Sequence, residues 1–99
     1  MNDIPRLSAR ERTILELLVS NGEMYGLQLV KASPEIKRGA VYVTLSRMAD
    51  KGFVKSRRVE EEALPGKPRP RYSITGLGQT ALNAHDSYVA HFTYKGAPA

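Results

Sequence analysis

The chain has 99 residues, which is enough for one small domain, and its apolar fraction of 41% supports a modest core. It has no cysteine and only two histidines, which excludes disulfides and thiolate metal ligands and leaves too few ligands for a buried zinc site. Because no apolar run is long enough to span a membrane and the first residues do not form a secretion signal, we expect a soluble, cytoplasmic protein with no membrane contact.

The formal net charge of +5 is concentrated in one segment. Residues 37–71 carry ten Lys and Arg against four Asp and Glu, whereas residues 1–36 have a net charge of −1 and residues 72–99 are neutral. A basic patch of this kind on a small domain is typical of a protein that binds a polyanion, most often nucleic acid.

The N-terminal segment predicts a short arm followed by a helix. Residues 1–7 carry no periodic pattern and are expected to form a flexible arm. Ser8 and Glu11 have the spacing of a capping box, in which each side chain bonds to the backbone of the other residue. The helical spacing of the apolar residues that follow predicts a helix over residues 9–20.

Two further helices are predicted before the basic segment ends. Residues 24–32 form a short apolar pattern that indicates a second helix, and residues 38–51 indicate a third. Val41, Leu45 and Met48 recur at positions i, i+4 and i+7 of the third helix and predict the stripe that it turns toward the core.

A hairpin and a last helix complete the pattern. Residues 53–59 and 71–75 read as two strands joined by a turn-rich loop, and Thr75 is placed to cap a helix over residues 76–92. Residues 93–99 are expected to be a frayed tail. The order predicts an α+β, mainly helical fold, a winged helix-turn-helix with three helices, a two-stranded β-wing and a C-terminal helix, whose DNA-binding domain covers residues 8–75.

The face of the third helix opposite its core stripe has features of a DNA-reading surface. Gly39 and Ala40 permit close approach to a phosphate backbone. Arg47 can contact a phosphate or, through two hydrogen bonds, a guanine, and Val43 can contact a thymine methyl group. The alternative is an ordinary solvated face with one exposed valine.

The segment KPRPR carries the more specific signal. Side chains alternate along an extended chain, so Lys67, Arg69 and Arg71 are expected to project to one side. The intervening prolines keep the backbone extended, which suits a loop or a sheet edge and lowers the entropy lost on ordering the cations. The alternative is an edge hairpin in which charge and proline prevent aggregation.

The last predicted helix carries an apolar stripe that is a candidate dimer interface. The stripe comprises Leu82, His85, Val89 and Phe92, with Tyr88 beside it. It can equally pack on the first helix of the same chain. A histidine in an apolar stripe, as His85 is here, is usually packed and neutral and only rarely acts as a pH switch.

These residues resemble the PadR-type winged-helix transcriptional regulators over residues 8–82. Tyr25-Gly26 matches a Tyr-Gly segment of the family, and residues 39–45 (GAVYVTL) fit its Gly-x-x-Tyr-x-x-Leu pattern at the recognition helix. Residues 51–54 (KGFV) are similar to its step into the wing, and residues 71–78 (RYSITGLG) to its exit from the wing.

The resemblance implies a homodimeric, DNA-binding repressor with the third helix in the major groove and the wing near the minor groove. It implies that Tyr42 contacts the DNA backbone. Together with the features above, the candidate DNA-binding residues are Arg38, Gly39, Ala40, Tyr42, Val43, Thr44, Arg47, Lys67, Arg69 and Arg71. The candidate dimer residues are Leu82, His85, Tyr88, Val89 and Phe92.

Three positions depart from the family pattern. Leu27 stands where many relatives have Tyr, and Ala40 and Val43 stand where Thr and Pro are common, so a base preference cannot be carried over. The short last helix implies a smaller dimer interface than in relatives with a long one. The chain has no Trp, so the tryptophan-lined drug pocket of some relatives is not supported, and a small-molecule effector is left undefined.

The leading hypothesis is therefore a sequence-specific transcriptional regulator whose partners are double-stranded DNA and a second copy of the chain. A winged-helix module whose basic wing binds an acidic protein is the alternative. An enzyme is not expected, because no motif joins a nucleophile, a base and an orienting group, and we expect no metal or cofactor.

Overall fold

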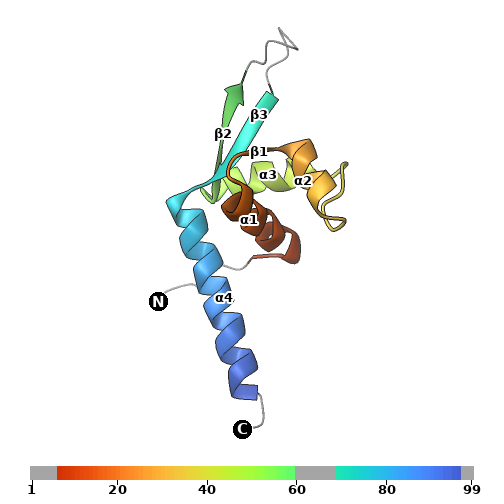
Figure 1. Ribbon diagram of the computed structural model, residues 1–99. Coiled ribbons are helices and arrows are strands. Elements are labelled where there is room, and N and C mark those ends of the chain that lie inside the picture. Colours follow the sequence, from red (N-terminus) through yellow and green to blue (C-terminus); the bar gives the residue numbers. More distant parts are fainter. Residues whose placement is uncertain (1–6, 60–68, 97–99) are drawn as a thin grey trace.

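The computed structural model describes residues 7–59 and 69–96, which form four helices and a three-stranded antiparallel sheet (Figure 1). In chain order these are α1 (Ala9–Asn21), β1 (Met24–Tyr25), α2 (Gly26–Ala32), α3 (Val41–Asp50), β2 (Val54–Val59), β3 (Arg69–Ile74) and α4 (Gly76–Gly96). The order confirms the predicted α+β winged helix-turn-helix. Residues 1–6 of the predicted arm lie outside the described residues, but Leu7 is buried, so the packed domain begins one residue before its predicted start.

The start of α1 confirms the predicted capping box. The Ser8 hydroxyl accepts a hydrogen bond from the backbone N–H of Glu11 at 3.1 Å, and the Glu11 carboxylate accepts one from the Ser8 N–H at 2.9 Å. The helix ends at Asn21 and is followed by Gly22, whose φ of 77° suits glycine and whose N–H donates to the Leu18 carbonyl. Both ends of α1 are therefore determined by local sequence.

The helix predicted over residues 24–32 is wrong at its first two residues. Met24 and Tyr25 form β1, which pairs with Tyr72 and Arg71 of β3, and α2 begins only at Gly26. The Gln28 side chain accepts a hydrogen bond from the Tyr25 N–H at 2.7 Å and so caps α2. The predicted two-stranded hairpin is consequently a three-stranded sheet.

Strand β3 lies at the centre of that sheet, in the order β1-β3-β2. This corrects the expectation that the proline-containing segment forms a sheet edge. The register explains how a central strand tolerates Pro70: β1 reaches only as far as Arg71, so among the described residues Pro70 pairs with Arg58 of β2 alone. Pairing of β2 with β3 continues to Val59 and Arg69.

Helix α3 is shorter than the predicted range of 38–51. Arg38 and Gly39 form a turn in which the Lys37 carbonyl accepts hydrogen bonds from the N–H groups of Ala40 and Val41. The helix ends before Gly52, whose φ is 82°. The predicted core stripe is confirmed, since Val41, Leu45 and Met48 are at most 1% exposed.

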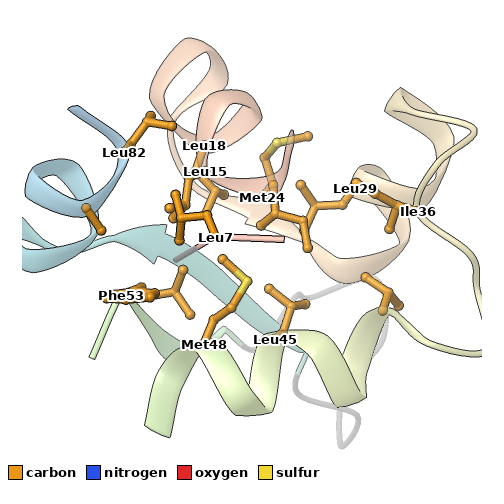
Figure 2. Close-up of a cluster of buried hydrophobic side chains, with 14 residues drawn as sticks. Leu7, Leu15, Leu18, Met24, Leu29, Ile36, Leu45, Met48, Phe53 and Leu82 are labelled. Atoms are coloured by element: carbon orange, nitrogen blue, oxygen red, sulfur yellow. The ribbon is translucent and has the colours of Figure 1, made fainter. Parts of the chain in front are cut away.

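The core lies between α1, α3 and the start of α4. Figure 2 shows Leu15 and Leu18 of α1 facing Leu45 and Met48 of α3. Leu82 of α4 belongs to the same cluster and is 5% exposed. The expectation that Leu82 lies at a dimer interface is corrected, because the turn of α4 that carries Leu82 packs on the apolar surface of α1 in the same chain.

Helix α4 extends beyond the rest of the domain (Figure 1). Thr75 caps it as predicted, since the Thr75 hydroxyl accepts a hydrogen bond from the Gly78 N–H at 2.9 Å. The helix continues to Gly96, so the tail predicted to fray from residue 93 is helical over four further residues. Across the described ranges, no helix combines the length and apolar character needed to cross a membrane.

Candidate nucleic-acid interface

The outward face of α3 is the surface that the sequence predicts. Tyr42 is 46% exposed and Val43 is 54% exposed, although both residues are large and apolar or aromatic. Arg47 is also exposed, whereas Thr44 is half-buried at the side of the helix and Ala40 is half-buried directly before it. Arg38 and Gly39 are exposed in the turn that precedes α3. The buried stripe on the opposite face therefore holds this surface toward solvent.

Gly26 positions the Tyr42 ring. A Cβ atom added at Gly26 would lie 2.7 Å from Cε1 and 3.0 Å from the hydroxyl oxygen of Tyr42, so glycine lets the ring lie close against the start of α2, and a larger residue would displace the ring. Tyr72 of β3 is also nearby: burial raises the pKa of Tyr72, and the neighbouring Tyr42 phenol adds to that rise. The Tyr25-Gly26 segment thus has a structural role that its sequence alone does not reveal.

The base of the wing is an ion-pair cluster centred on Glu23. Arg57 donates two hydrogen bonds to the Glu23 carboxylate, from Nε and Nη2, each 2.7 Å long. Arg71 lies 4.0 Å from the same carboxylate, and its guanidinium stacks on the Tyr25 ring at 4.7 Å from the centroid. The hydrogen bonds from Arg57 hold the pKa of Glu23 below its ordinary value.

This cluster involves one of the wing cations that the sequence predicts as DNA contacts. Of the three cations expected to project together from the wing, Arg71 is already engaged by Tyr25 and Glu23. Lys67 lies outside the described residues, and so does the side chain of Arg69. Sequence reasoning did not identify Glu23 as a partner, because no local pattern signals a contact between residues 34 positions apart.

A concavity of about 500 Å³ separates the start of α1 from one side of α3. It is lined by residues of both helices and of the turn after α3, namely Ser8, Ala9, Arg10, Glu11, Thr44, Arg47 and Lys51. Lys51 Nζ lies 3.0 Å from a carboxylate oxygen of Glu11. Over the described residues, Arg10 and Arg47 form no ion pair.

Glu11 is the buried charge of this region, with its side chain 9% exposed. Burial alone raises the pKa of this carboxyl, but hydrogen bonds from the Ser8 backbone and from Lys51, together with the charge of Lys51, outweigh burial and hold the pKa below its ordinary value. Glu11 therefore joins the start of α1 to the end of α3.

The Glu11→Gln variant is expected to lose stability at neutral pH but not in acid. A lowered pKa in the folded state means that the carboxylate stabilises the fold above its unfolded pKa of roughly 4.3, and that this contribution is lost as the pH falls through the folded pKa. We expect a cost of about 1 kcal/mol at pH 7. Urea unfolding at pH 7 and pH 3 measures it. Glu16→Gln, which removes an exposed pair with Arg12, is the control. A difference in unfolding free energy between the wild type and Glu11→Gln that is the same at both pH values would contradict this role of the Glu11 carboxylate.

The remaining candidate dimer residues lie on α4 beyond Leu82. His85 is half-buried, and Tyr88, Val89 and Phe92 belong to the part of α4 whose side chains lie outside the described residues. Among the described residues, no three His, Cys, Asp or Glu side chains gather where they could hold a metal ion.

The model of the PadR-like family of transcriptional regulators matches residues 14–84, from α1 through the first half of α4. The chain belongs to the PadR-like family. It is accordingly a transcriptional regulator and not an enzyme. The match includes α3, the wing and the turn of α4 that packs on α1. No curated protein matches the chain.

Solved structures share the PadR-like fold. A PadR family transcription regulator from Clostridium difficile has a TM-score of 0.75 and 24% identity, over 88% of this chain and 93% of that one. A PadR-like transcription factor from Bacteroides fragilis has a TM-score of 0.74 and 22% identity, over 86% and 84%. Bacillus subtilis PadR, solved in complex with operator DNA, has a TM-score of 0.70 and 23% identity, over 86% of this chain and 49% of that one.

Proposed function

We propose that this PadR-like regulator binds a two-fold DNA operator as a homodimer and represses transcription by occupying that site. In this proposal α3 lies in the major groove, and the wing formed by β2 and β3 lies beside it. The observation that carries the proposal is the exposed Tyr42–Val43 surface of α3, which the core stripe of the same helix holds toward solvent. Bacillus subtilis PadR, which shares the fold, was solved with operator DNA.

The size and chemistry of this surface suit the major groove. An α-helix with its side chains is about 10–12 Å across, and the major groove of B-DNA is about 12 Å wide. Val43 at the centre of the exposed face offers an apolar contact to a thymine methyl group, and Arg47 adds a cation on the same face. Cations of the wing supply contacts to phosphates that do not depend on sequence.

Helix α4 supports the dimer. A helix of 21 residues is about 31 Å long, and its first turns carry the buried Ala81 and Leu82 that pack on the domain. The part that extends away from the domain in Figure 1 is the arm available to a second copy. Two copies would place the two α3 helices about 34 Å apart, which is one turn of DNA.

Val43→Glu is expected to weaken operator binding at least about 100-fold, since it places a carboxylate in a groove lined by phosphates and leaves it without a partner. Val19→Glu is the matched control: Val19 is 48% exposed on α1 and receives the same charge. Anisotropy titrations with an operator duplex measure affinity, and thermal unfolding verifies that both variants fold. Equal affinity of the two variants would show that α3 does not enter the groove.

A further inference from the structure

The concavity between α1 and α3 has the charge of an anion site. Three of its lining side chains are cationic, those of Arg10, Arg47 and Lys51, and one is anionic, that of Glu11. The Glu11 carboxylate is already satisfied by Lys51 and by the Ser8 N–H. The lining therefore keeps a net charge of +2, and within the described part of the chain Arg10 and Arg47 have no carboxylate partner to neutralise them.

The concavity lies on one side of α3, opposite the side that carries Tyr42. At about 100° per residue, Thr44 and Arg47 lie on the side of the helix opposite Tyr42. On one side of α3, Tyr42 packs against Gly26 at the start of α2. On the other side, Thr44 and Arg47 line the concavity beside α1. A helix that fills the major groove meets a phosphate strand on each side, so the concavity lies where the second strand passes.

We propose that this concavity binds a backbone phosphate of the operator, held by Arg10 and Arg47 with Lys51 at its rim. The inference rests on the proposed function and extends the DNA surface to α1, which no sequence pattern indicated. A planar guanidinium forms two parallel hydrogen bonds to a phosphate, and two arginines that line one concavity suit that ligand. A volume of about 500 Å³ accommodates a phosphodiester with its water.

The proposal also selects one of the two contacts that are open to Arg47. From sequence, Arg47 can contact either a phosphate or a guanine. Because its side chain lines the concavity together with Arg10 and Lys51, the phosphate is the contact that the geometry favours. Arg47 then contributes affinity to every DNA sequence alike, and selectivity is left to the centre of the face around Val43.

Arg10→Ala is expected to lower affinity about tenfold for operator and scrambled duplexes alike, which corresponds to one charge-assisted hydrogen-bonded pair. The slope of log affinity against log salt should fall by about 0.9 for each phosphate that the variant no longer neutralises. Arg47→Ala should behave in the same way and keep the wild-type ratio of operator to scrambled affinity. Arg10→Lys, which keeps the charge, should recover most of the affinity.

Arg12→Ala is the matched control, because it removes the same charge two residues away, from a side chain paired with Glu16. Neutral methylphosphonates at single operator positions give a second readout: one position in each half-site should weaken the wild type and leave Arg10→Ala unchanged. If the wild type prefers an operator but Arg10→Ala matches Arg12→Ala in affinity and salt slope, the phosphate site is wrong. If the wild type prefers no sequence, the proposed function itself fails.

Discussion

Gly78→Ala is expected to destabilise the domain by about 3 kcal/mol, at the upper end of the cost of overpacking. A Cβ atom at Gly78 would collide with the carbonyl oxygen of Phe53 and lie 2.9 Å from Cγ1 of Ile74. That carbonyl cannot move freely, because it accepts a hydrogen bond from the Thr75 N–H at 3.0 Å. The first turn of α4 would have to separate from the end of the sheet.

Helix propensity alone predicts the opposite effect, because it favours Ala over Gly by about 1 kcal/mol inside a helix. Gly76→Ala is the control, since a Cβ atom at Gly76, in the same turn of α4, meets nothing within 4 Å. Urea unfolding at one fixed protein concentration measures both variants. Equal stability of the two variants would show that α4 does not pack against Phe53 as described.

Leu45→Ala is expected to cost about 2–5 kcal/mol, the range for buried leucines. Leu45 is fully buried at the centre of the stripe that attaches α3 to the core. A domain of this length is stable by only about 5–15 kcal/mol, so the variant should lose a large part of its stability. Its DNA affinity should fall as well, since α3 would no longer be held against α1.

Val43→Ala is the control on the same helix, because Val43 is 54% exposed and its truncation should change stability by less than about 0.5 kcal/mol. Urea unfolding midpoints compare the two variants. A Leu45→Ala protein as stable as Val43→Ala would mean that the two faces of α3 are assigned the wrong way round.

Sequence alone predicted the features that depend on neighbouring residues. The capping box at Ser8 and Glu11 defined the start of α1, because both hydrogen bonds form within one turn. The stripe of Val41, Leu45 and Met48 defined the two faces of α3, because helical period alone decides which residues share a face. The exposed surface of α3 was therefore predictable in detail.

The features that sequence missed join residues far apart in the chain. Met24 and Tyr25 look helical locally but pair with β3, almost fifty residues later. Leu82 fits a dimer stripe and a core equally well, and only the position of α1 decides between them. The concavity beside α3 needs α1 to lie across its end, which no periodicity in either helix encodes.

The basic segment is also less uniform than its composition indicates. Acids from outside the segment balance some of its cations: Glu11 pairs with Lys51, and Glu23 binds Arg57 and approaches Arg71. These pairs fix the base of the wing and the end of α3 to the N-terminal third of the chain. Arg47 has no ion pair among the described residues, and this leaves it available for the phosphate contact that we propose.

Selection of bound sequences from a random DNA pool, with the purified protein at about 0.15 M salt, tests the central claim most directly. We predict recovery of a palindrome whose half-sites lie about one helical turn apart, which would establish both DNA reading and the dimer. Recovery of no motif, with binding that disappears as salt rises, would contradict sequence-specific recognition and would favour a basic surface that binds an acidic protein.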